Sequence, residues 1–235
     1  MSTFGSILQE MERKIIETSD GSLSIYLPEW DENYHSKHGA VQEAYHVFIR
    51  SGLDLFADKE QVSILEMGYG TGLNCMISFL EAQRRGLHID YTGLEAYPLD
   101  EGTVLKLNHL QQLKAGRFEN FYHKMLRAEW DRRTEIDKNY FLNKRNLMFE
   151  DFDEEQNFDL IYFDAFGARV QPELWTEAIF RKMYLALRNN GVLVTYSAKG
   201  SVRRAMQSVG FVVERLPGPP GKREMLRAKK TESQP

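Results

Sequence analysis

The stretch Ile64-Leu-Glu-Met-Gly-Tyr-Gly-Thr-Gly-Leu-Asn74 decides the fold, because an apolar run leads through three glycines directly into a helical pattern. Glycine allows a tight turn and lets a ligand lie against bare backbone. The spacing is G-x-G-x-G, whereas the turn that cradles a dinucleotide pyrophosphate is G-x-G-x-x-G. Glu66, two residues before the first glycine, suits an ammonium group and would repel a phosphate. S-adenosyl-L-methionine has a cationic amino acid head and no pyrophosphate, so the turn predicts this cofactor beside Gly68, Gly70 and Gly72.

A second acid supports the same cofactor. Glu95 follows the apolar run 88–94, and a carboxylate at the end of this strand can accept hydrogen bonds from both ribose hydroxyls. Two alternatives stay open: the glycines make only a tight turn with Glu95 a surface acid, or the cofactor is a nicotinamide dinucleotide, against which the glycine spacing argues. The remaining candidates for cofactor binding are Tyr34, Asn74 and Asp151.

Apolar runs typical of buried strands alternate with helical patterns along most of the chain. Strands are expected at 62–67, 88–94, 159–163, 192–196 and 211–216. Helices are expected at 40–56, 73–85, 173–187 and 201–209, with Asn190-Gly191 ending the third of them. This alternation predicts an α/β fold with a doubly wound, mainly parallel sheet and helices on both faces. Together with the predicted cofactor site, it indicates a fold of the class I methyltransferase Rossmann-like type.

Two regions depart from the alternation. Near the N-terminus, 14–17 and 22–27 flank Ser19-Asp20-Gly21 and predict a small β element. The charged stretch 98–135 is helical in pattern and longer than one crossover needs, and 140–142 is expected to pair with 147–149. We therefore expect a single methyltransferase domain over 1–235. It would comprise an N-terminal β extension at 1–39 and a core at 40–235 that carries a helical insertion at about 98–135.

Composition limits the class of protein. The 235 residues are 42% hydrophobic and 27% charged with one cysteine, so the chain can bury a full core without disulfides. No apolar run approaches the roughly 20 residues needed to span a bilayer, and the N-terminus lacks a signal-peptide apolar region. We expect a cytoplasmic protein with no membrane partner. We expect no metal, because His35, His38 and His46 lack a known metal-binding spacing.

Asp164 follows the predicted strand 159–163, at the edge of an open α/β sheet where ligands bind. It is the candidate catalytic residue and would hold the atom to be methylated; the alternative is an N-cap or loop acid for the next helix. Phe166 and Trp175 are candidates to stack on a base, or else are core residues.

The net charge of -4 alone argues against a nucleic acid partner, but the distribution of charge does not. From 199 to 230 the chain carries nine basic residues and two acids, which fits a polyanionic partner. The alternative is a solvated helix face with a charged tail. The candidate substrate-binding residues are Phe166, Lys199, Arg203, Arg204, Lys222 and Arg223.

Several motifs together resemble the methyltransferase domain of MnmC and its stand-alone relative MnmD. These motifs are the stretch 66–74, Asp164-Ala-Phe166, Pro172-Glu-Leu-Trp175 and Lys222-Arg-Glu-Met-Leu226. The resemblance runs from about Asp31 to Ala228, with 197–204 and Tyr34, Ser36 and Glu43 also matching. The chain departs from the family's usual Phe and Asn at His35 and Gln171.

The resemblance implies methylation of the aminomethyl group of 5-aminomethyl-2-thiouridine at the tRNA wobble position, with the anticodon loop as partner. It implies methyl transfer only, because the FAD-dependent oxidase half of the two-domain relatives is absent; a separate oxidase partner is not readable from the sequence. Asp164 would orient the lone pair of the amine and accept its proton. The alternatives are a small-molecule methyl- or aminopropyltransferase of the same fold, or an inactive scaffold that binds RNA or protein.

Overall fold

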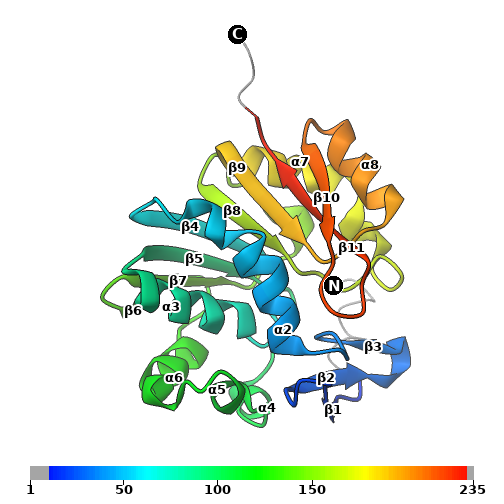
Figure 1. The fold of residues 1–235 in the computed structure, drawn as a ribbon. Coiled ribbons are helices and arrows are strands. Elements are labelled where there is room, and N and C mark those ends of the chain that lie inside the picture. The colour runs from blue at the N-terminus through cyan, green and yellow to red at the C-terminus, as the bar shows by residue number, and fades with distance from the viewer. Residues whose placement is uncertain (1–10, 232–235) are drawn as a thin grey trace.

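The computed structural model describes residues 11–231, and an eight-stranded sheet runs through its centre (Figure 1). The strands are β4 (Gln61–Met67), β5 (His88–Leu94), β6 (Arg132–Asp137), β7 (Tyr140–Arg145), β8 (Phe158–Phe163), β9 (Leu187–Thr195), β10 (Val212–Pro217) and β11 (Glu224–Lys229). Their order is β10-β11-β9-β8-β4-β5-β7-β6. The strands from β9 to β7 in this order pair in parallel, whereas β6, β10 and β11 pair antiparallel with their neighbours. The expectation of a doubly wound, mainly parallel sheet is confirmed.

Helices cover both faces of the sheet and divide the core into two layers (Figure 1). The helices that cover the sheet are α2 (Ala40–Ala44), α3 (Leu73–Arg85), α6 (Glu119–Arg127), α7 (Glu177–Ala186) and α8 (Gly200–Ser208). Adjacent residues of β4 belong to different layers: Ile64 clusters with α2, α3 and α6, and Leu65 clusters with α7 and α8. Because successive side chains alternate across a strand, both faces must be apolar, which explains the continuous hydrophobic runs in the sequence.

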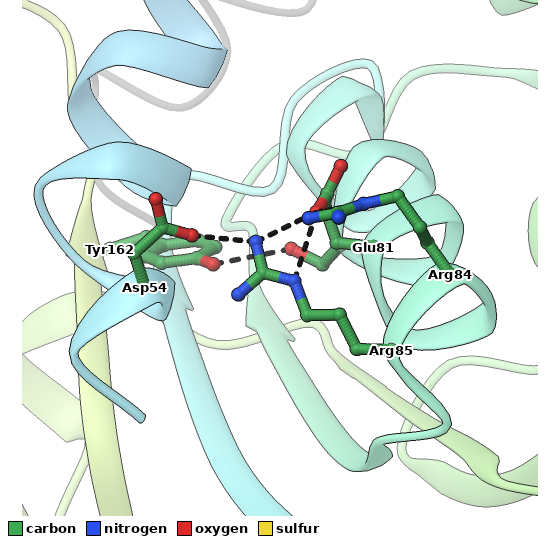
Figure 2. Close-up of polar contacts among 6 residues, drawn as sticks. Asp54, Glu81, Arg84, Arg85 and Tyr162 are labelled. Carbon is green, nitrogen blue, oxygen red and sulfur yellow. Dashed lines mark hydrogen bonds and ion pairs between the residues drawn. The ribbon is translucent and has the colours of Figure 1, made fainter. Parts of the chain in front are cut away.

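A charged cluster anchors the end of α3 that is remote from the glycine turn (Figure 2). Arg85 Nη2 donates to Asp54 Oδ1 over 2.6 Å and to Glu81 Oε2 over 2.7 Å, and Arg84 Nη2 donates to the same Glu81 oxygen. Burial would raise the pKa of Glu81, but the hydrogen bonds from Arg84 and Arg85 hold it below its usual value. The cluster therefore ties α3 to the segment before β4 and steadies the helix that begins at the site.

A three-stranded antiparallel sheet precedes the core and consists of β1 (Lys14–Glu17), β2 (Leu23–Leu27) and β3 (Glu32–Asn33). The predicted turn forms between β1 and β2, where Asp20 Oδ1 accepts hydrogen bonds from Thr18 Oγ1 and the Ser22 amide. After β3 the chain reaches the glycine turn, since the Tyr34 ring lies 3.4 Å from where a Cβ on Gly70 would stand. Residues 1–10 of the expected extension lie outside the described residues.

The middle of the chain differs from what the sequence predicts. The helical stretch expected over 98–135 consists of short helices, α4 (Glu101–Val104), α5 (His109–Gln112) and α6, and it ends at Arg127. Residues 132–137 form β6, which pairs with β7 as an edge strand, so the expected pairing of 140–142 with 147–149 is wrong. An edge strand exposes many of its side chains, and its charged residues therefore resemble a polar helix in sequence.

The helix boundaries differ from the expected ones in two more places, and β11 is a strand that the sequence did not predict. The helix expected over 40–56 is α2 followed by a π-helical segment, Tyr45–Arg50, and a 3-10 turn, Leu53–Phe56. The helix expected to end at Asn190-Gly191 ends at Ala186; Asn190, with φ 64°, lies inside β9 where its register with β8 shifts. β11 falls in a basic stretch without a hydrophobic run, which hides it in the sequence.

Candidate active site

A cavity of about 680 Å³ is lined by residues that follow β4, β5, β8 and β9. These strands are parallel, so the segments after them gather at one edge of the sheet. The predicted site residues that line this cavity are Tyr34, Glu66, Gly68, Gly70, Asn74, Glu95, Asp164, Phe166 and Lys222. Residues of the segment after β3 and of α2 also line this cavity.

The glycine turn requires glycine at the positions that face the cavity. Gly68 has φ 93°, and a Cβ at this residue would lie 2.8 Å from the backbone oxygen of Asp164. Gly70 has φ 50° and its amide donates to Glu95 Oε2 over 3.0 Å. Gly72 precedes α3 and does not line the cavity; a Cβ there would meet Tyr69. Bare backbone is therefore presented to a ligand by Gly68 and Gly70.

The donor and acceptor set around Glu95 fits the ribose of S-adenosyl-L-methionine. The Gly70 and Tyr97 amides each donate to one oxygen of the Glu95 carboxyl, both over 3.0 Å. Burial raises the pKa of Glu95, and these amide hydrogen bonds partly offset the rise. Each carboxyl oxygen has two lone pairs, so both can accept a second hydrogen bond from a ribose hydroxyl. Glu95 is thus oriented toward the cavity before any ligand binds.

A hydrogen-bonded chain links the glycine turn to the candidate catalytic residue. Asn74 Nδ2 donates to Glu66 Oε1 and to Asp164 Oδ2, each over 2.8 Å, while Tyr91 donates to Glu66 Oε2. Glu66 is 1% exposed, and burial raises its pKa well above the usual value. Its two oxygens each hold one hydrogen bond, which leaves room for a contact from an ammonium group.

Asp164 faces the cavity, and its pKa is raised well above the usual value. The pKa of Asp164 is raised to about 7, mainly by burial and in addition by the nearby charge of Glu43. The hydrogen bond from Asn74 and the charge of Lys222 act in the opposite direction. A carboxyl with this pKa accepts and releases a proton near neutral pH, which is the property of a general base at that pH.

The candidate stacking residues separate into a wall residue and a core residue. Phe166 lines the cavity, with its ring in edge contact with Tyr34 at 5.0 Å and Trp30 at 5.8 Å between centroids. Trp175 is 5% exposed, packs on Phe163 and donates to the backbone oxygen of Phe166 over 2.8 Å. Trp175 is therefore a core residue that holds the Phe166 backbone in place by its hydrogen bond.

Lys222 is inside the cavity and already has a partner. Its Nζ lies 2.5 Å from Glu43 Oε1 and 3.8 Å from the centroid of the Tyr196 ring. The sequence predicts Lys222 as a phosphate-binding residue of the basic face, and the structure places it in the cavity lining, paired with Glu43.

The other predicted site residues lie outside the cavity lining. Asp151 is exposed at the end of the 3-10 turn Phe149–Asp151, and its neighbours Phe149 and Glu150 line the cavity instead. The remaining basic candidates are at the start of α8 or in the β10–β11 turn, and they are Lys199, Arg203, Arg204 and Arg223. Within residues 11–231, no ion pair is recorded for these four. By contrast, Arg215, Arg227 and Lys229 are paired with Glu214 or Glu224.

Glu43 and Tyr196 line the cavity but were not predicted as site residues from the sequence. Glu43 lies on α2, and Tyr196 directly follows β9 with its hydroxyl donating to the backbone oxygen of Ala165 over 2.7 Å. The rule that ligands bind after parallel strands would have found Tyr196. It gives no signal for Glu43, because α2 precedes the first strand of the central sheet.

Among the described residues, no group of three or more His, Cys, Asp or Glu is arranged to hold a metal ion. Over the same range, 11–231, none of the helices combines the length and the apolar character needed to cross a membrane.

The sequence is similar to known methyltransferases. Residues 117–231 match a family described as S-adenosyl-L-methionine-dependent methyltransferase. The chain is 29% identical over 228 residues to the tRNA 5-methylaminomethyl-2-thiouridine biosynthesis bifunctional protein MnmC of Cupriavidus metallidurans, covering 87% of this chain and 32% of that protein. It is 30% identical over 214 residues to MnmC of Ralstonia nicotianae, covering 85% and 32%. The chain thus spans about a third of the length of the curated relatives it matches.

Two solved structures share the fold. MNMC2 from Aquifex aeolicus has a TM-score of 0.72 at 23% identity, over 96% of this chain and 72% of that chain. Spermidine synthase from Thermotoga maritima has a TM-score of 0.57 at 13% identity, over 95% and 70%. The family match over residues 117–231, the fold and the cavity at its glycine turn make the chain similar to S-adenosyl-L-methionine-dependent methyltransferases. Within this class, it resembles the methyltransferase domain of MnmC and its stand-alone relative MnmD.

Proposed function

We propose that the protein methylates the aminomethyl group of 5-aminomethyl-2-thiouridine at the wobble position of tRNA. The observation that carries the proposal is Asp164, a carboxyl with a pKa of about 7 that faces the same cavity as the glycine turn and Glu95. The MnmC relatives are named for biosynthesis of the 5-methylaminomethyl product of such a transfer. We further propose that the described chain acts as one methyltransferase domain in the cytoplasm.

The cavity residues have distinct roles in this reaction. S-adenosyl-L-methionine held there would supply a sulfonium methyl group for in-line displacement by an amine nucleophile. Glu95 would hold the ribose hydroxyls, while Glu66 would face the ammonium group of the amino acid head. Asp164 would accept a proton from the substrate ammonium and orient the resulting lone pair. The proposed cofactor-binding set is Tyr34, Glu66, Gly68, Gly70, Asn74 and Glu95.

The aromatic wall supports a nucleobase as the acceptor. Phe166 and Tyr34 present rings to the cavity beside Asp164. Bases of an RNA loop can be splayed out and stacked on aromatic side chains, which places the substituent of the base at the reacting end. A wobble base in an anticodon loop meets this requirement without the opening of a duplex.

Basic residues beside the cavity provide a proposed surface for the tRNA backbone. Thr195 at the end of β9 pairs with Leu226 of β11, so the β10–β11 turn and the start of α8 lie at the same edge of the sheet. Arginine and lysine there would contact phosphates and give salt-dependent affinity. The proposed backbone-contacting residues are Lys199, Arg203, Arg204 and Arg223.

The second candidate function is transfer to a small amine by an enzyme of the same fold. The likeness to spermidine synthase is a likeness of fold only. One assay separates the two. The protein is incubated with labelled S-adenosyl-L-methionine and tRNA from cells that lack it, and the nucleosides are analysed by mass. A new 5-methylaminomethyl-2-thiouridine peak is expected, and tRNA without the aminomethyl group is the control substrate. Transfer of the methyl label to a small amine but not to tRNA would overturn the proposal.

A further inference from the structure

Glu43 and Lys222 form an ion pair inside the cavity, although they are 179 positions apart in the chain. Lys222 Nζ is 2.5 Å from Glu43 Oε1, and the Glu43 side chain is only 12% exposed. Lys222 also lies over the Tyr196 ring, and the Tyr196 hydroxyl donates to the backbone oxygen of Ala165, the residue after Asp164. The pair is therefore held at a fixed place in the cavity that Asp164 also lines.

The position of this pair is not explained by stability alone. Removing two charges from water costs free energy, and a shielded ion pair often gains little over apolar residues of similar size. α2 buries Ala40 and Ala44 against the core without using Glu43, which faces the cavity instead. Two opposite charges placed beside a titrating carboxyl shift its proton affinity in opposite directions.

We infer that the Glu43–Lys222 pair is a positioning device that sets how readily Asp164 takes a proton from the substrate amine. The inference rests on the proposed function. A primary ammonium gives one proton to the Asp164 carboxylate and becomes a neutral amine. The nitrogen lone pair then forms the new N–C bond, the C–S bond breaks, and its electrons remain on sulfur. The product is a secondary ammonium, and Asp164 releases its proton to solvent.

Several groups face Asp164 from the elements around it. Glu43 of α2 raises the pKa of Asp164, and Lys222 of the β10–β11 turn lowers it. Asp164 in turn raises the pKa of Glu66 on β4 and of Tyr196 after β9, and Glu32 of β3 also acts on Tyr196. Of these groups, Glu43 and Lys222 can be exchanged for neutral side chains without touching the hydrogen bonds of Asp164 itself.

The test compares Glu43→Gln, Lys222→Met and the double variant in the protein saturated with S-adenosylhomocysteine. The titration midpoint of Asp164 is followed by carbon NMR of labelled aspartate, with the signal assigned by its loss in Asp164→Asn. We expect E43Q to lower the midpoint by about one pH unit and K222M to raise it by a similar amount. The double variant should lie between them. The acidic limb of the kcat/KM profile on tRNA should move in the same directions.

Glu224→Gln is the matched control, because it removes one carboxylate from a more exposed ion pair with Arg215 on the neighbouring strands. It should leave the midpoint of Asp164 unchanged. General loosening of the cavity cannot produce shifts of opposite sign, so unchanged midpoints or shifts in one direction would overturn the inference. Opposite shifts without any methyl transfer to tRNA would instead refute the proposed function and leave the charge arrangement standing.

Discussion

Asn74 Nδ2 donates a hydrogen bond to Asp164 Oδ2 over 2.8 Å and so joins the first turn of α3 to the residue after β8. The same nitrogen donates to Glu66, and in both contacts the amide favours the ionised form of the carboxyl. Burial acts against this and favours the neutral form. Asp164 therefore changes its protonation state near neutral pH while its orientation toward the cavity stays constant.

Replacing Asp164 by Asn should stabilise the protein at alkaline pH while it impairs the reaction. The pKa of Asp164 rises from 3.8 to about 7 on folding, so the folded state binds more protons between these values. Stability is therefore lost as pH rises through this window, and the full deficit is present above pH 7. We expect the free energy of unfolding at pH 8 to be about 2–4 kcal/mol higher for D164N than for the native protein, allowing for water in the cavity. Urea unfolding at pH 3 and pH 8 measures the difference, which should nearly vanish at pH 3, below the unfolded value of 3.8.

Asp58→Asn, which changes an exposed aspartate in the same way, is the control variant. Methyl transfer by D164N should fall about 10²–10⁴-fold, the usual contribution of a general base. Affinity for S-adenosylhomocysteine should remain. Near-native turnover in a folded D164N protein would remove Asp164 from the catalytic role.

The cofactor side of the site could be predicted because local sequence determines it. A glycine turn after an apolar strand, with acids such as Glu66 and Glu95 at the ends of parallel strands, places its ligand at one sheet edge by topology. Asp164 was predicted by the same rule. The structure brings these residues to one cavity.

The substrate side was less predictable because its contacts join distant parts of the chain. Lys222 looks like a surface cation in sequence, and only the fold reveals that Glu43 lies against it. The edge strand β6 was missed for a related reason: its pairing with β7 depends on a turn at 138–139 and not on a hydrophobic run. Periodicity describes burial within an element, but not which charged side chains meet across elements.

Gly68→Ala should lower stability and cofactor affinity more than the replacement of another glycine that also has a positive φ. A Cβ at residue 68 would lie 2.8 Å from the Asp164 backbone oxygen, and the backbone there has φ 93°, a conformation that favours glycine. Gly86, which ends α3 with φ 67°, has nothing within 4 Å of its would-be Cβ. We expect G86A to cost about 1 kcal/mol and G68A about 1–3 kcal/mol more, with weaker binding of S-adenosylhomocysteine. Urea unfolding and calorimetric titration test this; equal effects would show that the close contact does not constrain the turn.

Salt dependence tests whether the basic residues beside the cavity contact the tRNA backbone. Each lysine or arginine that neutralises a phosphate of a single strand contributes about 0.7 to the slope of log affinity against log salt. The variants Lys199→Gln, Arg204→Gln and Arg223→Gln should each weaken tRNA binding and reduce this slope by about 0.7. Arg215→Gln is the control, because Arg215 already lies 3.7 Å from Glu224 and should change the slope less. If the triple variant keeps the native slope, the RNA backbone binds another face, and the basic residues at the α8 and β10–β11 edge serve only solubility.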